Sequence, residues 1–337
     1  MTLLPHRVAG QSSIGISQAD LPVFQQAWWI EIAKGDADFR ELQVHRDGVL
    51  VGNLVYILVT NKLGNKLGFP PVWSHLGGPV VSQTLTREER AEVIRELVAQ
   101  LPSNTSFKFV CSPSSSDADL IKQEFERAEF DCSTEATYLQ YPNDKGILER
   151  LSGEAKRQII SAPKKLQVVD ISADEFIAFY KVNLTAAGKQ SYASLQSARD
   201  LIARGQEDNR QQVRVIAARQ KIAGAPLDAA IAYAWDKQRY YLWMVTHRSS
   251  SDRDSEHKPH HHAGKLLILH GTEDARRRGL IFDADGATTE GNQTLYRNRL
   301  KFPHTEYRDV FSRDTKLYKL YKRLQPKLRV QNARPRQ

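Results

Sequence analysis

The sequence predicts a mixed α/β fold made of two consecutive modules, each with a central mixed sheet flanked by helices. Stretches with helical periodicity alternate with short apolar runs along the whole chain. The chain has 337 residues, which exceeds the usual size of one domain, and 41% of them are hydrophobic, enough for two cores. We therefore expect one module at 1–145, a second at 146–326, and a basic tail at 327–337.

The first module alternates helices and strands without a recognisable cluster of catalytic side chains. Thr86 and Glu89 form the sequence pattern of a capping box, which marks the start of a helix that Pro102 ends. We interpret 64–71 as a Gly/Pro-rich loop. Other helices are expected at 24–32 and 116–128, and strands at 42–45, 49–60, 73–81, 107–111 and 137–141.

The second module begins with a basic helical stretch at 147–165. Ser172 and Glu175 form another capping box. The pattern after them predicts helices from 172 and at 193–203, strands at 167–170, 213–218, 229–235, 240–245 and 306–310, and a last helix at 316–324.

Residues 264–302 form a helix–strand–helix unit that organises the second module. A helix begins at Gly264, carries three arginines in its last turn, and stops at Gly279, where a left-handed conformation suits glycine. A buried strand follows at 280–282, and Thr289 caps a second helix through Leu300. The N–H groups of the first helical turn, with Lys265 beside them, predict an anion site.

Charge and cysteine content limit the classes of protein. The net charge is +9, but eight basic and no acidic residues lie in 316–337, so the rest of the chain is almost neutral. The two cysteines, Cys111 and Cys132, and the absence of a secretory signal predict reduced thiols in a cytoplasmic protein. No apolar run is long enough to span a membrane. The basic tail could contact the anionic inner face of a membrane, or tRNA.

The second helix of this unit resembles a helix of the GNAT acyltransferases, through Asn292, Leu295, Tyr296 and Phe302. The helix from Gly264 to the Arg-Arg-Arg-Gly end resembles the pyrophosphate-binding helix of that family. The resemblance implies that Gly264, Lys265 and Asn292 contact an acyl-CoA. It also implies that Tyr296 protonates the departing thiolate, for which a phenol with a pKa near 10 is well matched.

The order of motifs resembles the FemAB-like branch, in which two GNAT modules are fused. The stretch 156–165, the segment from Phe179 through Gly188 to Tyr192, and the turn 282–286 are each similar to a FemAB-like motif. This resemblance implies transfer of an acyl or aminoacyl group onto the amine of a sugar, an amino acid or a cell-envelope precursor. The acceptor is then either a small molecule or a precursor linked to a lipid.

Two alternatives to an acyl-CoA enzyme stay open. Residues 260–265, His-His-His-Ala-Gly-Lys, stand where the family has its coenzyme A loop, and only Gly264 matches that loop. This departure and the basic tail suit an aminoacyl-tRNA donor. The third interpretation is a module that keeps the fold but only binds a partner.

Further candidate residues lie around the expected central strand. Asp283 and Asp285 follow it and could bind or deprotonate the acceptor, or form a solvated turn. His247, Arg248 and Tyr192 are candidates for acceptor binding. Neighbouring histidines at 257–262 are poorly placed to close one tetrahedral site, and no cysteine joins them, so we expect no metal.

Overall fold

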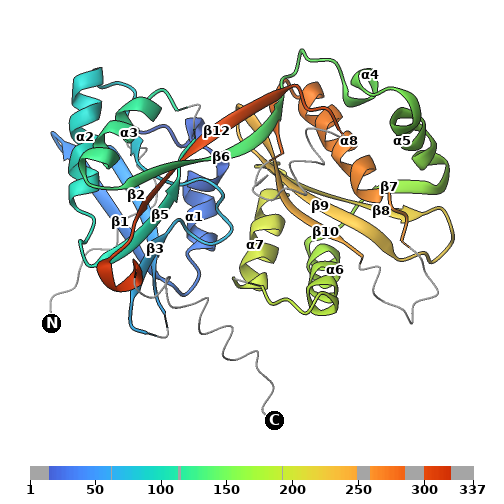
Figure 1. Ribbon diagram of the computed structural model, residues 1–337, viewed down its shortest axis with the longest axis horizontal. Helices are drawn as coiled ribbons and strands as arrows, with labels where there is room; N and C mark the ends of the chain where they lie inside the picture. The colour runs from blue at the N-terminus through green and yellow to red at the C-terminus, as the bar shows by residue number, and fades with distance from the viewer. Residues whose placement is uncertain are drawn as a thin grey trace, which may run out of the picture.

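A single sheet of twelve strands runs through the protein and joins its two halves (Figure 1). The computed structural model describes residues 15–61, 63–112, 115–191, 193–248, 259–284 and 300–319. The strand order is β1-β2-β3-β5-β12-β6-β11-β10-β9-β8-β7, with β4 paired to β2 at the side. This arrangement confirms the mixed α/β class.

The first half contains the sheet from β1 to β6 and the helices α2 and α3. Its strands are β1 (Asp38–Arg46), β2 (Val49–Thr60), β3 (Lys66–Phe69), β4 (Val80–Val81), β5 (Thr105–Val110) and β6 (Asp131–Gln140). The helices α2 (Arg87–Ala99) and α3 (Ala118–Arg127) cover one core. The capping box is confirmed: the Thr86 hydroxyl accepts from the Glu89 N–H at 3.3 Å, and the Glu89 carboxylate accepts from the Thr86 N–H at 2.8 Å.

Two expectations for this half were wrong. Residues 66–69 form β3 inside the expected loop, and only Val80–Val81 of the expected 73–81 strand is a strand. Trp73 has a φ of 64° and Gly78 a φ of 111°, neither of which fits an extended strand. The segment between β3 and β4 therefore leaves the sheet, and the Trp243 indole of the second half donates to the Trp73 carbonyl at 2.9 Å.

The second half is a sheet with helices on both faces (Figure 1). Its strands are β7 (Leu166–Asp170), β8 (Val213–Gln220), β9 (Leu227–Trp235), β10 (Arg239–His247) and β11 (Ile281–Asp283). One face packs on α4 (Ile147–Arg150), α5 (Gly153–Lys165) and α8 (Ala263–Arg277), and the other on α1 (Ala27–Ala33), α6 (Ala173–Ala186) and α7 (Leu195–Gly205). We expected residues 147–165 to form one helix. They form two, α4 and α5, because the backbone is extended at Leu151 and Ser152 between them.

The last strand, β12 (His304–Arg313), inserts between β5 and β6 and thus returns to the first half. Its register with β6 runs from His304–Leu139 to Ser312–Asp131. In Figure 1, β6 and β12 are the long ribbons that span the two halves. The module boundary at 145 follows β6 and remains a prediction.

Four remaining expectations concern the C-terminal region and membrane segments. Residues 316–319 begin the expected last helix, whereas the rest of it, the basic tail and most of the expected helix from Thr289 lie outside the described residues. In the part of the chain that the structure describes, no helix has the length and apolarity that crossing a bilayer requires.

Candidate functional site

The parallel strands β10 and β11 pair over a short distance, up to the end of β11. Their register covers Arg239 to Tyr241 on β10 and Ile281 to Asp283 on β11. Beyond Tyr241, β10 continues to His247 and remains paired with β9, with a bulge between Leu242 and Met244. The carboxyl ends of parallel strands are where open α/β sheets bind ligands, so the end of β11 beside β10 marks the candidate site.

The helix α8 begins beside the far end of β10. The Leu266 N–H donates to the His262 carbonyl at 3.0 Å, which is the first bond of the helix, and no acidic residue lies in its first turn. Gly264 is buried under the His247 ring: a Cβ on Gly264 would lie 2.2 Å from His247 Cε1. The structure thus brings together two residues that the sequence analysis predicted for different ligands.

His262 occupies the N-cap position of α8 with a buried ring. Its exposed fraction is 7%, and its Nδ1 has no hydrogen-bond partner in the described ranges. Burial and then the neighbouring His261 lower the pKa of His262 to about 4, so the ring is neutral at physiological pH. Lys265, half-buried, lies one residue beyond Gly264. The helix start therefore combines first-turn N–H groups, a cation and a neutral imidazole.

Arg248 follows β10 and is held by the neighbouring strand and by α6. Its Nε donates to the Leu227 carbonyl at 2.8 Å, and its guanidinium lies 5.7 Å from the centroid of the Phe179 ring. Both contacts fix the side chain close to the end of β10. Its part in acceptor binding stays a prediction.

Asp283, at the carboxyl end of β11, is fully buried and accepts hydrogen bonds from three side chains of the described residues. Thr137 Oγ1 donates at 2.5 Å, Arg308 Nη2 at 2.7 Å and Arg239 Nη1 at 2.9 Å. Burial by itself would raise the pKa of Asp283, but Arg308 and Arg239 outweigh it and lower the pKa. A carboxylate in this state is a weak base, which favours a positioning role over proton transfer.

The ion pairs around Asp283 extend to β12. Arg239 Nη2 also donates to both oxygens of Glu306, at 2.8 and 2.9 Å. The sequence analysis did not identify Arg239, Arg308 or Thr137. The available signal was an arginine in each of two strand-like stretches, Arg239 and Arg308. Their shared partner, Asp283, is far from both in the sequence.

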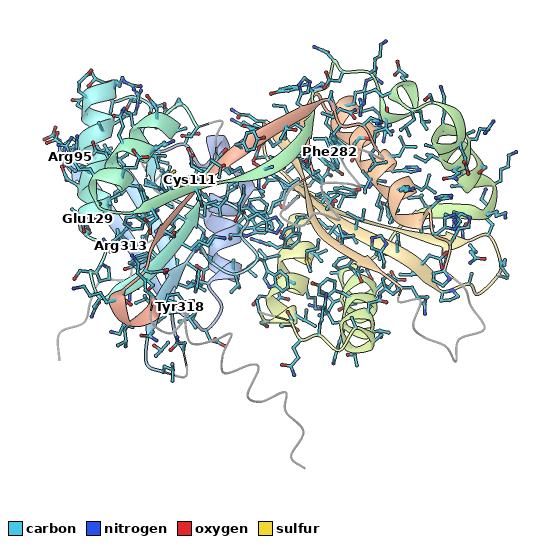
Figure 2. The ribbon with its side chains drawn as sticks, in the orientation of Figure 1. Arg95, Cys111, Glu129, Phe282, Arg313 and Tyr318 are labelled. Atoms are coloured by element: carbon cyan, nitrogen blue, oxygen red, sulfur yellow. The ribbon has the colours of Figure 1, made fainter. Side chains whose placement is uncertain are left out.

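A cavity of about 480 Å³ lies between the halves, on the side of Arg239. Ser82, Ser112 and Asp117 line it from the first half, and Asp236 and Tyr241 from the second. Cys111, labelled in Figure 2, also lines it, whereas Phe282 belongs to the α8 core.

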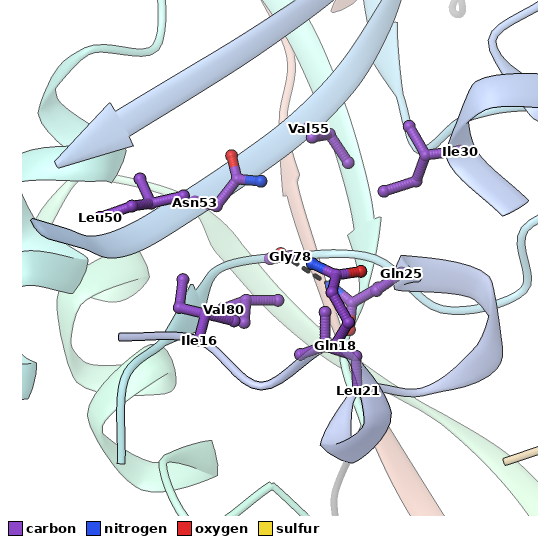
Figure 3. Close-up of a pocket in the computed structure, with 10 residues that line it drawn as sticks. All are labelled: Ile16, Gln18, Leu21, Gln25, Ile30, Leu50, Asn53, Val55, Gly78 and Val80. Carbon is purple, nitrogen blue, oxygen red and sulfur yellow. Dashed lines mark hydrogen bonds between the residues drawn. The ribbon is translucent and has the colours of Figure 1, made fainter. Parts of the chain in front are cut away.

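A smaller hollow of about 30 Å³ adjoins the cavity (Figure 3). The two share Ile16, Leu21, Gln25 and Val80 in their walls. The Gln25 side-chain amide donates to the Gly78 carbonyl at 3.0 Å across this hollow. The hollow has room for a water molecule or two rather than for a substrate.

Four predicted site residues lie outside the described residues. They are Tyr192, Asp285, Asn292 and Tyr296. Their roles therefore stay predictions. In the described ranges, no three His, Cys, Asp or Glu side chains gather as metal ligands would.

Comparison with known proteins identifies the fold. No family model and no curated protein matches the sequence. Among solved structures, FemX is similar with a TM-score of 0.59, 12% identity, and coverage of 88% of this chain and 94% of FemX. The C-terminal domain of a putative lysylphosphatidylglycerol synthetase from Agrobacterium fabrum has a TM-score of 0.52, 12% identity, and coverage of 86% and 92%. L-PGS from Bacillus licheniformis has a TM-score of 0.51, 9% identity, and coverage of 88% and 95%. The chain therefore has the fold that FemX and these two synthetase structures share.

Proposed function

We propose that this protein is an N-acyltransferase that moves an acyl group from acyl-CoA to an amine. The observation that carries the proposal is the short parallel pairing of β10 and β11, which ends at Tyr241 and Asp283, together with the start of α8 beside His247. Open α/β sheets bind ligands at the carboxyl ends of such strands, and the start of α8 provides N–H groups for the phosphates of a thioester donor.

The donor's phosphates bind at the first turn of α8 in this proposal. Gly264 has no side chain to fill that turn, Lys265 supplies a positive charge, and the helix has no acidic residue there to repel an anion. The buried Nδ1 of His262 is a further polar atom at the same turn. Asn292 is proposed as an additional contact to the donor.

The acceptor reaches the thioester from the opposite face of the sheet. On β10, Tyr240 packs into the core under α8, whereas Tyr241 packs into the core with α6 and α7. Asp283 pairs with Tyr241 in the β10–β11 register, and Tyr241 lines the cavity between the halves. An amine in that cavity approaches β11 without competing with the donor for α8.

Chemistry at this site needs a deprotonated amine, a polarised carbonyl and a protonated leaving thiolate. We propose Tyr296 for the last role. Asp283, ionised and held by two arginines, fixes the end of β11, and Asp285 is the better candidate for contact with the amine. Arg248 and Tyr192 are proposed to contact the acceptor near the end of β10. The sequence analysis proposed the same for His247, but its ring packs against Gly264 on the donor face of the sheet.

An aminoacyl-tRNA donor is the second candidate, and the basic surface near α8 favours it. Arg157, Lys164 and Lys165 are exposed on α5. Lys165 is close enough to His260 to lower the pKa of that imidazole, together with burial and His261, which have larger effects. These cations could bind the phosphates of an RNA backbone. The lysylphosphatidylglycerol synthetase structures also show that this fold occurs in proteins named for attaching lysine to a lipid.

Calorimetric titration of the full chain decides between the donors. We expect saturable binding of acetyl-CoA or a longer acyl-CoA, with only weak binding of aminoacyl-tRNA that disappears as salt rises. Binding of tRNA that discriminates aminoacylated from free tRNA, with no binding of any acyl-CoA, would replace the first proposal by the second. Absence of binding by both donors would leave a non-catalytic module on the same fold.

A further inference from the structure

An apolar turn joins β8 to β9 at the outer edge of the second half, on the side away from the first half (Figure 1). Its sequence, 221–226, is Lys-Ile-Ala-Gly-Ala-Pro, so no polar side chain follows Lys221. Ile222 is 65% exposed. Hairpin turns usually carry Asn, Asp or Ser beside Gly and Pro. An exposed turn that has an isoleucine in their place is typical of a contact surface.

The turn has an ordered backbone that adjoins the end of α5. The Ala225 N–H donates to the Ile222 carbonyl at 3.0 Å, and Gly224 has a φ of 72°, in the left-handed region. The Lys221 N–H donates to the Lys165 carbonyl, on the last residue of α5, at 2.8 Å. The Ile222 side chain is therefore presented to solvent by a fixed turn beside a helix end.

The exposed side of α5 combines basic residues with a second isoleucine. Ile160 is 52% exposed. Lys156 and Lys164 are four residues from it in either direction, and Arg157 is three residues before it, so all three lie on its side of the helix. Lys164 and Lys165, in the last turn, are exposed next to the apolar turn. The helix thus surrounds an exposed aliphatic side chain with cations.

The charge of these two segments is strongly positive. Residues 153–167 and 219–228 together contain six basic and two acidic residues, Glu154 and Asp228. Asp228 is 2% exposed and accepts from the His260 N–H at 3.1 Å, so it is not part of the exposed surface. Within the described ranges, no ion pair occupies five of the basic residues: Lys156, Arg157, Lys164, Lys165 and Lys221.

The apolar residues favour a lipid surface over RNA as the partner. Proteins that bind single-stranded RNA combine cations with aromatic side chains on which bases stack. No aromatic residue occurs in 153–165 or 219–226. Exposed aliphatic side chains instead enter the boundary between lipid headgroups and acyl chains, while neighbouring lysines extend to the headgroup phosphates. Cations around two exposed isoleucines therefore match an anionic bilayer.

We propose that the turn 221–226 and the exposed side of α5 form a docking surface for an anionic lipid bilayer. Ile222 and Ile160 enter the interfacial region of the bilayer. The basic residues that contact the lipid phosphates are Lys156, Arg157, Lys164, Lys165 and Lys221. This docking requires neither a donor nor an acceptor, so it does not depend on the proposed transfer reaction.

The docking surface lies at the end of the sheet where β10 finishes. Ala229 of β9 pairs with Ala218 of β8 and with His247 of β10, so the turn between β8 and β9 is at the same end as the carboxyl end of β10. Docking therefore orients this end of the sheet toward the bilayer. A lipid-linked acceptor would then reach the candidate site across this edge, a consequence that does rest on the proposed function.

Co-sedimentation of the full chain with vesicles tests the docking surface. We expect binding to phosphatidylcholine vesicles that contain about 30% phosphatidylglycerol to be about ten-fold or more stronger than binding to pure phosphatidylcholine. Ile160→Ser combined with Ile222→Ser should weaken binding to the anionic vesicles about five-fold, because apolar area no longer enters the interface. Lys164→Ala combined with Lys221→Ala should weaken it about twenty-fold at low salt, because each charge near an anionic surface contributes about five-fold.

Two exposed residues of α6, on the opposite face of the sheet, supply matched controls. Val182→Ser removes an aliphatic side chain that is 60% exposed, and Lys181→Ala removes an exposed cation. Both should bind vesicles as the wild type does. The basic tail is present in every protein, so differences between variants report the docking surface alone. Thermal melting identifies the folded variants, and only these are compared.

Three results would overturn the proposal: equal binding to both kinds of vesicle, unchanged binding by both double variants, or equal losses in the α6 controls. Titration with tRNA checks the other polyanion. If the isoleucine variant loses as much affinity for tRNA as for vesicles, the surface binds RNA instead. Donor titration separates this proposal from acyl transfer. Binding of acyl-CoA without vesicle binding rejects the docking surface alone, whereas vesicle binding that the double variants lose, with no donor bound, rejects the acyltransferase alone.

Discussion

Arg308 of β12 donates to Asp283 of β11 at 2.7 Å, and both side chains are at least 95% buried. This contact connects β12, which returns to the first half, with β11, at whose end the candidate site lies. With Arg239 on β10 as the second cation, it fixes three strands where the pairing of β10 and β11 ends. The geometry of the site therefore depends on residues from both halves of the chain.

Loss of the Asp283 carboxylate should destabilise the protein strongly. Asp283→Asn leaves Arg239 and Arg308 buried without their shared partner, which we expect to lower the free energy of unfolding by about 3–5 kcal/mol. Urea unfolding measures the change. The matched control is Arg40→Leu, which removes a half-exposed pair with Asp38 and should change stability by less than about 1 kcal/mol. Equal effects of the two variants would show that the buried cluster is not a determinant of stability.

The same carboxylate should make stability depend on acid pH. The pKa of Asp283 is lower in the folded protein than its ordinary value, so its contribution is complete above about pH 4 and is lost as the pH falls through the folded pKa. Urea midpoints of the wild type should therefore fall between pH 5 and pH 3. Asp283→Asn should lose less stability over that interval, and parallel curves for the two proteins would contradict this assignment.

Gly264 should be required for donor binding because the His247 ring packs directly against it. Gly264→Ala places a methyl group 2.2 Å from His247 Cε1, so the imidazole must move into the space proposed for the phosphates. We expect donor affinity to fall about ten-fold or more while the melting temperature changes little. His247→Ala combined with Gly264→Ala removes the clash and should recover part of the affinity. Equal affinities for all these proteins would place the phosphates elsewhere.

The basic tail should add attraction to polyanions without being needed for transfer. Deleting 327–337 removes four of the eight basic residues of 316–337. We expect weaker binding to vesicles of anionic lipid or to tRNA, a smaller salt dependence of that binding, and unchanged transfer to a small soluble amine. Identical binding by the truncated and complete chains at low salt would show that the tail does not contact either polyanion.

Local sequence signals predicted α8 and the strand after it, and most of the other helices, but not the site's contacts. Capping boxes at Thr86 and Ser172 and the stop at Gly279 depend on neighbours in the chain, and each is present in the structure. Strand β3 was missed because Gly68 and the prolines after it suggest a loop. In the sheet, that glycine is needed because a Cβ there would lie 2.2 Å from the Phe107 ring.

The contacts of Asp283 and the cavity depend on pairs that are far apart in sequence. Asp283 is 146 residues from Thr137 and 44 from Arg239, so no local pattern relates them. The cavity wall likewise combines Ser82 with Gln238. The contacts of Asp283 come from the pairing of β11 with β6 and β10 and from the position of β12 beside β6, which no periodicity in the sequence indicates.

Transfer itself is the most direct test of the central claim. Full-length protein is incubated with isotope-labelled acetyl-CoA and glucosamine, and mass spectrometry counts labelled amide product against coenzyme A released. The account predicts one amide for each coenzyme A. It also predicts a 100- to 10,000-fold lower rate for Tyr296→Phe, because that variant loses the proposed proton donor to the thiolate. Tyr307→Phe, at an exposed position on β12, should keep the wild-type rate. Release of coenzyme A without any labelled amide, or equal rates for wild type and Tyr296→Phe, would contradict the account.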